Sequence, residues 1–211
     1  MNIGMHKYGQ YKNDFFRKLN YKFLPNKSIL DIGCGDGSDA KIFIDEFSLR
    51  VTGIDVFEHE KIKEIKGLDF DVGSMLELPF GNETFDYIFL HDVLHHIDEE
   101  CQSRSDHILG LCEVRRVVKK SGTIVIVEAN RYNPISYLNM VKLHGHNHFT
   151  QSYFHSLILS VFPKARFKYF EAHNYPFSLP IWRVYELIME KIVPKAFLSY
   201  NIAIIDAHEF N

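Results

Sequence analysis

No apolar run in the sequence approaches the roughly 18 consecutive residues that a membrane-spanning helix needs. The first 19 residues are polar and aromatic and lack the apolar stretch of a secretory signal, which argues against export. Only three cysteines are present, Cys34, Cys101 and Cys112, and their spacing matches no metal or redox motif. These absences favour a reducing compartment and predict a cytoplasmic protein.

Basic charge is not in excess either, because the formal net charge is −3 and the lysines and arginines form only short clusters. Proteins that bind nucleic acids usually carry a basic stripe, so a nucleic-acid partner is disfavoured. Apolar residues make up 46% of the chain and charged residues 24%, which is typical of a globular domain rather than a disordered segment.

The first 130 residues alternate between expected strands and expected helices. Short apolar runs predict strands at 28–32, 50–56, 69–72, 85–90 and 123–128. Helical spacing or turn signals predict helices at 8–20, 38–47 and 105–119, and a turn at 120–122. Such alternation indicates parallel strands joined by right-handed crossovers, with helices on both faces of the sheet.

The last third continues differently, with two helices and two more strands. The helices are expected at 150–162, with Thr150 as N-cap, and at 179–193, and the strands at 165–171 and 199–207. The chain is therefore predicted to be one α/β domain over 1–211, a doubly wound, Rossmann-like sheet of seven strands. The sheet is expected to be mostly parallel, with an antiparallel last strand.

The turn after the first strand, Gly33-x-Gly35-x-Gly37, is the most informative segment. Glycine at such a turn lets a ligand approach the backbone closely. Asp31 and Asp36 flank the turn, and two carboxylates repel a pyrophosphate but attract a ligand that carries an ammonium and a sulfonium. The spacing also differs from the G-x-G-x-x-G pattern of dinucleotide sites, so a nicotinamide or flavin dinucleotide is disfavoured.

Five segments, taken in order, resemble the class I S-adenosylmethionine-dependent methyltransferases, and within them the methyltransferase type 11 group. They are DIGCGDG at 31–37, GID at 53–55, GSMLELPF at 73–80, FDYIFLHDVLHHI at 85–97 and EVRRVVKKSGTIVIVE at 113–128. The resemblance covers about residues 28–130. It implies that S-adenosylmethionine is the methyl donor and that S-adenosylhomocysteine is the product. It also divides the chain into a helical lead-in (1–27), a cofactor-binding core (28–130) and an acceptor-side elaboration (131–211).

The resemblance assigns the methionine portion of the cofactor to the glycine turn, at Asp31, Gly33, Cys34, Gly35 and Asp36. Leu90 or His91, at the end of the fourth strand, would lie along the methionine arm.

Asp55 ends the second strand about 20 residues after the turn, where an acidic side chain accepts both ribose hydroxyls of an adenosine. The alternative role of Asp55 is to cap a helix or turn. By the resemblance, Val56 lies against the adenine, and Ser74 and Met75 lie at its edge. The family often carries Asp at the position of Ser74.

Candidate general bases follow the fourth strand, at the carboxyl edge where such sheets bind ligands. His91 is the first candidate for a catalytic residue and His96 the second, whereas His95 is at least as well explained as a structural residue. An oxygen or nitrogen acceptor can require a general base, whereas a carbon or sulfur acceptor can react without one. The polar residues at 128 and 130–133 either bind a polar acceptor at the same rim or form a polar loop.

Two further segments leave alternatives open. The motif His144-x-His146-x-His148 has no carboxylate or cysteine to complete a metal set, so no metal is predicted and a lid over the substrate is preferred. The aromatic segment 175–200 packs on the sheet, covers an apolar acceptor, or makes peripheral contact with a membrane. This aromatic content favours a small-molecule or a lipid- or glycan-linked acceptor.

Three functions are compatible with a Rossmann-like sheet and a glycine turn. The favoured one is S-adenosylmethionine-dependent methyl transfer. The alternatives are an NAD(P)-dependent oxidoreductase and a non-catalytic partner subunit that binds S-adenosylmethionine. Nucleic-acid base methylation is disfavoured because His91-Asp92-Val93-Leu94 stands where such enzymes carry an Asn/Asp-Pro-Pro-aromatic motif. The sequence leaves the oligomeric state open.

Overall fold

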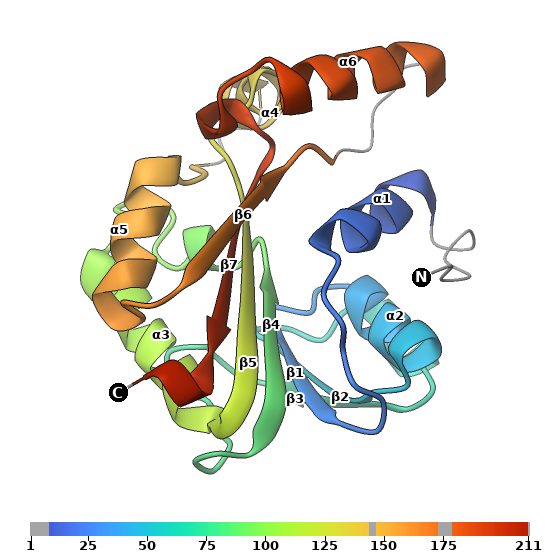
Figure 1. The fold of residues 1–211 in the computed structure, drawn as a ribbon. Coiled ribbons are helices and arrows are strands. Elements are labelled where there is room, and N and C mark those ends of the chain that lie inside the picture. Colours follow the sequence, from blue (N-terminus) through green and yellow to red (C-terminus); the bar gives the residue numbers. More distant parts are fainter. Residues whose placement is uncertain (1–8, 144–146, 173–178, 211) are drawn as a thin grey trace.

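The structure, a computed structural model, describes residues 9–143, 147–172 and 179–210. Its centre is a seven-stranded sheet with the order β3-β2-β1-β4-β5-β7-β6 (Figure 1). The strands are β1 (Ser28–Ile32), β2 (Arg50–Asp55), β3 (Leu68–Val72), β4 (Phe85–His91), β5 (Val118–Ala129), β6 (Arg166–Phe170) and β7 (Tyr200–Asp206). Only β7 is antiparallel to its neighbours. The predicted Rossmann-like sheet with one antiparallel strand is confirmed.

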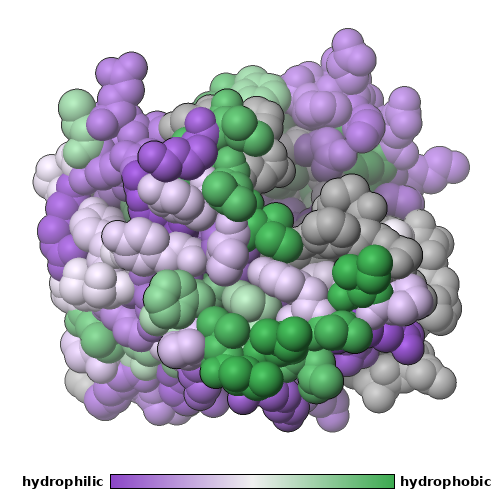
Figure 2. Space-filling view, turned by 90° about the horizontal axis from the view of Figure 1, so that it is seen from above, coloured by the Kyte–Doolittle hydropathy of each residue, from purple (hydrophilic) through white to green (hydrophobic). Residues whose placement is uncertain are grey.

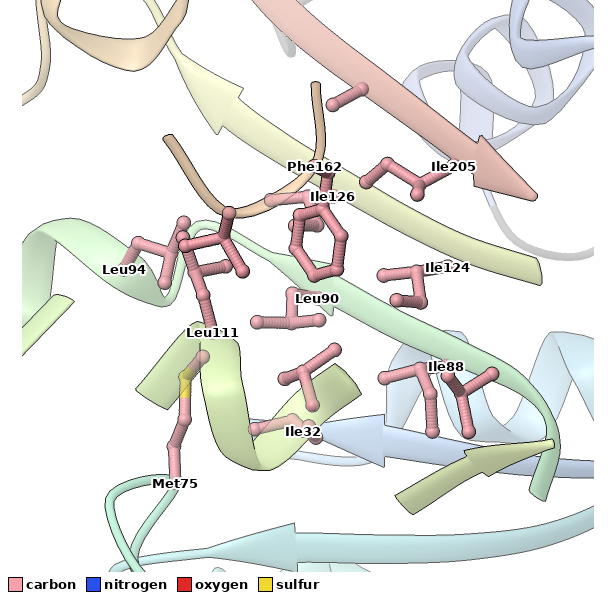
Figure 3. Packing of buried hydrophobic residues seen from close by; sticks show 14 of the residues in the cluster. Ile32, Met75, Ile88, Leu90, Leu94, Leu111, Ile124, Ile126, Phe162 and Ile205 are labelled. Atoms are coloured by element: carbon pink, nitrogen blue, oxygen red, sulfur yellow. The ribbon is translucent and has the colours of Figure 1, made fainter. Parts of the chain in front are cut away.

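Helices cover both faces of the sheet. On one face lie α1 (Gly9–Leu19) and α2 (Ser38–Phe47), and on the other lie α3 (Arg104–Val117) and α5 (Gln151–Val161) (Figure 1). The side chains of β4 alternate between these two layers. Leu90 packs with Leu111 of α3 (Figure 3), whereas Phe89 packs with Phe43 of α2. Because both faces are covered, the central residues of β4 (87–90) and β5 (124–127) are buried and apolar or aromatic on both faces, as the sequence predicts.

Local signals in the sequence set several element boundaries correctly. The α2 helix starts after Gly37, whose φ of +75° is costly for other residues. Thr150 is the N-cap of α5, as predicted, and its side chain accepts a hydrogen bond from the Tyr153 amide.

The turn predicted at 120–122 is wrong as an element boundary, because β5 runs without a break from Val118 to Ala129. The residues concerned form a bulge in the pairing with β4. Val118 pairs with Phe85, and the next paired residue of β5 is Thr123, opposite Tyr87. The residue pattern Lys120-Ser121-Gly122 therefore marks a bulge rather than a turn, since the two structures favour the same residue types.

Short helices close the upper end of the molecule, beyond the carboxyl ends of β4 and β5 (Figure 1). They are α4 (Pro134–Ser136), η4 (Tyr137–Leu143), α6 (Leu179–Lys191) and η5 (Lys195–Phe197). Three further short helices, η2 (Glu60–Glu64), η3 (Leu94–His96) and η6 (Ala207–Glu209), lie elsewhere. The last third of the chain thus adds β6 and β7 to the common sheet and adds a helical cap over its carboxyl edge.

Candidate functional site

A cavity of about 600 Å³ opens at the carboxyl ends of β1, β2 and β4. This is the position where the strand order reverses, between β1 and β4, and where open α/β sheets bind their ligands. Its walls include Gly33, Gly35, Ile54, Asp55, Val56, Phe57, Ser74, Met75, Asp92, Val93, His96 and Ile97. A second hollow of about 650 Å³, beside Arg115 and Arg116, contains none of the predicted site residues.

The glycine turn forms one wall of the cavity and holds the carboxylate of Asp55. Gly33 and Gly35 have φ angles of +66° and +52°, in the left-handed region that favours glycine. The Gly33 amide donates to the carbonyl of Ile54 at 2.8 Å, which joins the turn to β2. The Gly35 amide donates to Asp55 Oδ2 at 2.8 Å. Asp55 is therefore held at the cavity wall through only one of its two oxygens.

The two glycines give a matched pair of variants. An alanine at 33 would place its Cβ 2.5 Å from Val93 Cγ2, whereas an alanine at 35 would meet nothing within 4 Å. Both carry the cost of a positive φ, so we expect Gly33→Ala to lower the free energy of unfolding by about 1–3 kcal/mol more than Gly35→Ala. Urea denaturation of both variants measures the difference, and equal losses would contradict the close packing of Val93 on the turn.

Asp31, at the end of β1, is the carboxylate that fits a cationic ligand. It is 2% exposed, and its Oδ2 is buried and has no hydrogen-bond partner among the residues that the structure describes. Burial and the nearby charge of Asp39 raise the pKa of Asp31 well above its ordinary value. An ammonium beside Asp31 would supply the missing partner and offset the repulsion between the two carboxylates.

Asp36, the other acid that flanks the turn, is already paired. Its carboxylate accepts hydrogen bonds from Lys61 Nζ at 3.0 Å and from the Ser38 amide at 3.1 Å. Burial raises the pKa of Asp36, but these two partners outweigh burial and lower the pKa below its ordinary value. Neither Asp31 nor Asp36 is among the residues that line the cavity, whereas Asp55 is. Asp31 has a better claim to a ligand than Asp36 because its Oδ2 is buried without a hydrogen-bond partner among the described residues.

Apolar side chains form the opposite end of the cavity. Val56 and Phe57 follow β2 and are 69% and 58% exposed, which is unusual for apolar residues without a ligand or partner. Ser74 and Met75 also line the cavity, and the Ser74 hydroxyl accepts a hydrogen bond from the Leu76 amide. The sequence had indicated three of these four residues, and Phe57 was missed because nothing in its spacing marks it.

Five predicted cofactor residues are absent from the cavity walls, namely Asp31, Cys34, Asp36, Leu90 and His91. Two of them, Leu90 and Cys34, have their side chains inside the fold. Leu90 is fully buried and packs into the core beside Ile32 and Leu111 (Figure 3). Cys34 lies in the turn with its side chain against Gly53, and burial raises the pKa of its thiol well above the ordinary value. These positions can contribute to a site only by shaping the backbone.

His91 lies under α1 in a chain of buried polar contacts. Its Nδ1 is 2.8 Å from Asp39 Oδ2, and its Nε2 is 3.1 Å from the hydroxyl of Tyr11. The Tyr11 hydroxyl is also 2.7 Å from that of Tyr200, and the His91 ring stacks on Phe15. Because a carboxylate only accepts, Asp39 fixes the proton on Nδ1 and leaves Nε2 as the proton acceptor.

Lys12 joins this network from the same helix. Its ammonium lies 2.6 Å from Asp39 Oδ1. Burial raises the pKa of Asp39, but Lys12 and His91 outweigh burial and hold the pKa well below its ordinary value. Burial also raises the pKa of Tyr11 and of Tyr200, so both phenols are neutral donors at neutral pH.

Asp92 connects the network to the cavity, since it lines the cavity and its Oδ2 lies 3.9 Å from His91 Nε2. Its φ of +57° is rare outside glycine and is held by the Ala129 amide, which donates to Asp92 Oδ1 at 2.7 Å. The strained backbone thus aims a carboxylate toward the space between the cavity and His91.

The other two histidines after β4 have different surroundings. His96 lines the cavity, is half exposed, and its Nδ1 is 3.1 Å from Glu99 Oε2. His95 is 1% exposed, and its Nδ1 is 2.7 Å from Oε2 of the fully buried Glu128. The structural alternative for His95 therefore fits the structure well.

Glu128 ties η3 to the end of β5. Its Oε1 accepts hydrogen bonds from the Val93 and Leu94 amides, and its Oε2 faces His95. Ligand atoms of Asp92, His95 and Glu128 lie within 4.8 Å of one another, a spacing that a metal ion could use. Hydrogen bonds already occupy both oxygens of Glu128, and these bonds account for the arrangement.

Of the predicted histidine motif, His144 and His146 lie outside the described residues, and the ring of His148 is 4.4 Å from that of His95.

Burial raises the pKa of Glu128 from 4.5 to about 7, which gives a testable pH dependence. A carboxyl whose pKa is raised by folding contributes stability below its unfolded pKa, and this contribution is lost as the pH rises through the folded value. We expect the melting temperature of the wild type to fall mainly as the pH rises from 4.5 to about 7, the interval between the ordinary pKa and the raised one. Glu128→Gln, which keeps an acceptor oxygen but does not titrate, should lack this fall in calorimetric scans. An identical fall in the variant would contradict the assignment.

The arrangement defines a class of protein. A seven-stranded sheet with one antiparallel strand, a glycine turn after β1 and a carboxylate at the end of β2 is the fold of the class I, S-adenosylmethionine-dependent methyltransferases. Residues 30–126 match the model of a family described as "Methyltransferase domain". The core of this chain is therefore a methyltransferase domain, as the sequence motifs predicted.

Individual proteins that are similar to this chain in sequence or in fold are also methyltransferases. Demethylmenaquinone methyltransferase of Alkalihalophilus pseudofirmus is 28% identical over 140 residues, which are 61% of this chain and 55% of that protein. Phosphoethanolamine N-methyltransferase 2 of Caenorhabditis elegans is 33% identical over 85 residues, 36% of this chain and 20% of that protein. The matches thus span between a fifth and about half of these relatives. A SAM dependent methyltransferase from Archaeoglobus fulgidus has the same fold, with a TM-score of 0.66 at 20% identity over 96% of this chain and 97% of its own.

Proposed function

We propose that this protein transfers a methyl group from S-adenosylmethionine to a small-molecule or lipid-linked acceptor. The observation that carries the proposal is the pair of carboxylates beside the glycine turn. Asp55 has one oxygen free of the Gly35 amide at the cavity wall, and Asp31 has a buried oxygen without a partner. One acceptor for hydroxyls and one for an ammonium suit an adenosyl amino acid, whereas a pyrophosphate would meet two carboxylates.

The residues that would hold the cofactor divide by chemistry. Asp55 accepts hydrogen bonds from the ribose hydroxyls, and Asp31 compensates the charge of the amino group. Val56, Phe57 and Met75 supply the apolar surface for the adenine, with Ser74 at its edge. When bound, S-adenosylmethionine supplies a methyl group on an activated sulfonium, so the protein's task is to orient the acceptor and exclude water.

His91 is the residue that we assign to proton transfer from an oxygen or nitrogen acceptor. Asp39 holds its ring so that Nε2 takes the proton, and the Tyr11 hydroxyl stands at that nitrogen. A proton leaving the acceptor can pass through the Tyr11 hydroxyl to Nε2, while Asp39 balances the charge that the ring gains. His96 lies at the cavity rim, and the carboxylate at its Nδ1, Glu99, is partly exposed rather than buried.

The surroundings of His91 favour one chemical class of acceptor. Aromatic rings of Tyr11, Phe15 and Tyr200 surround His91, which suits an apolar or aromatic acceptor that carries a hydroxyl or an amine. One relative is named for demethylmenaquinone, and such an acceptor would suit these rings. The three cysteines are free thiols, and we propose a reducing, cytoplasmic location.

Two measurements test the proposal. Calorimetry should show binding of S-adenosylhomocysteine and no binding of NAD, and the reverse result would sink the assignment. The full chain should also be incubated with labelled S-adenosylmethionine and a metabolite or lipid extract, followed by mass spectrometry. We expect a labelled small or lipid-linked product. Label on protein alone would contradict the proposed acceptor class, and cofactor binding without any labelled product would favour a non-catalytic subunit.

A further inference from the structure

The outer face of α6 carries a stripe of exposed apolar residues that no other described element covers. Five apolar side chains of this region are between 43% and 76% exposed, namely Ile181, Val184, Leu187, Ile188 and Ile192. Their spacing of three, four and seven residues places them on one side of the helix. Leu138 and Leu143 of η4 and Phe197 of η5, at the same upper end, are 64%, 77% and 42% exposed (Figure 1). Figure 2, which views this end from above, shows hydrophobic side chains gathered on it.

A different face of α6, the inner one, packs against the rest of the molecule. The exposed apolar stripe is therefore not the surface through which α6 packs on the fold. Trp182 and Met189 are each 3% exposed and point into the molecule. Glu186 and Glu190 both form ion pairs with Lys18 of α1, the second at 2.7 Å. The two acidic residues of α6 are thus paired with Lys18 of α1, although Glu190 is exposed. Among the described residues, the unpaired charges on the exposed side of α6 are the basic residues Arg183 and Lys191.

The charge of this part of the chain is opposite to that of the whole. Residues 129–205 contain eight lysines and arginines but three acidic residues, a net charge of +5, whereas the whole chain carries −3. The third acid, Glu171, is fully buried and accepts hydrogen bonds from Asn133 and the Ser199 amide. Arg183 and Lys191 on α6 and Lys142 on η4 are exposed beside the apolar stripe.

We propose that this face, made by α6 with η4 and η5, docks on the surface of an anionic lipid bilayer. An exposed apolar stripe edged by cations, with its acids paired with Lys18, matches the headgroup and acyl layers of such a surface. A second copy of this face would bring the same positive charges together, so self-association fits less well. No helix in the part of the chain that the structure describes is long and apolar enough to span a membrane, so the contact is peripheral.

The position of this face relative to the proposed acceptor site suggests what docking would do. The cap lies over the carboxyl edge of the sheet, and α6 is bound through Lys18 to α1, the helix that brings Tyr11 to His91. Docking would therefore present the acceptor side to the lipid, a consequence that rests on the proposed function. Docking itself requires no methyl transfer, so the two can be tested separately.

The test is sedimentation of the full chain with vesicles. We expect the protein to pellet with phosphatidylcholine vesicles that contain phosphatidylglycerol, to stay in solution with phosphatidylcholine alone, and to be released by salt. Val184→Glu with Ile188→Glu should weaken binding at least about tenfold, because an apolar contact is replaced by charge. Arg183→Gln with Lys191→Gln should weaken it about 25-fold, about fivefold for each cation.

Matched controls separate docking from other effects. Leu109→Glu on α3 replaces an apolar residue that is 50% exposed, and Lys63→Gln replaces an exposed cation, both away from this face, so neither should change vesicle binding. Calorimetry with S-adenosylhomocysteine shows whether each variant keeps its cofactor site, and its failure in the wild type would count against the proposed function alone. Absence of pelleting with anionic vesicles, equal binding by the α6 variants, or a dimer in sedimentation velocity that these variants disperse would overturn the docking proposal.

Discussion

Replacement of His91 by Asn is expected to lower kcat by about 10²–10⁴-fold, the usual contribution of a positioned general base. The physical reason is the position of His91 between Asp39, which fixes its tautomer, and the Tyr11 hydroxyl at Nε2. The variant should still bind S-adenosylhomocysteine, because the cavity walls do not include this ring. Labelled methyl transfer to the acceptor identified from the extract, together with calorimetry, measures both quantities.

Several companion variants test the role rather than the fold. Tyr11→Phe removes the hydroxyl but keeps the ring, so we expect a smaller loss in kcat and a changed pH profile. His96→Ala removes the other candidate base, which is half exposed and faces Glu99, and should leave kcat within about threefold of the wild type, as expected for a group outside the proton path. If kcat falls in His96→Ala and not in His91→Asn, the base has been assigned to the wrong histidine. Melting temperatures must be compared, because the His91 ring stacks on Phe15 in the core.

Asp55→Ala is expected to weaken binding of S-adenosylhomocysteine by about 10–100-fold. The variant loses charged hydrogen bonds, each worth about 1.5–3 kcal/mol, and also frees the Gly35 amide that orders the turn. Asp36→Ala is the matched control, because it removes a carboxylate from the same turn that is paired with Lys61 outside the cavity. Calorimetry on the two variants should separate them by at least about fivefold. Equal affinities would refute the ribose role of Asp55.

The sequence predicts the cofactor side of the site, at Asp55 and the glycine turn, better than it predicts the network around His91. The carboxylate at 55 and the turn at 33–37 are close in space because β1, the turn, α2 and β2 form one β-α-β unit, in which the carboxyl ends of the two parallel strands lie side by side. The network at His91 joins residues 11, 39, 91 and 200, which belong to two helices and two strands. Helical spacing predicted the lead-in helix, but no spacing rule says which of its residues meets β4.

The sequence also does not show which acidic side chains of the turn have a charged or hydrogen-bonding partner. Asp31 and Asp36 look equivalent in the sequence, since both are acids that flank the glycine turn. The structure buries Asp31 without a partner for its Oδ2 and pairs Asp36 with Lys61, which comes from η2. Partners from distant segments thus decided which acid is available to a ligand.

By itself, the sequence determined the elements and their order, the glycine turn, the position of Asp55 and the class of domain. These features depend on periodicity, on φ angles that only glycine adopts easily and on short, fixed connections, all of which are local. Tertiary structure alone decided that α1 covers His91, that Glu128 is buried against His95 and that α6 turns its acids toward Lys18. Contacts of this kind depend on how whole elements pack, and packing is set by the shape and burial of many side chains together.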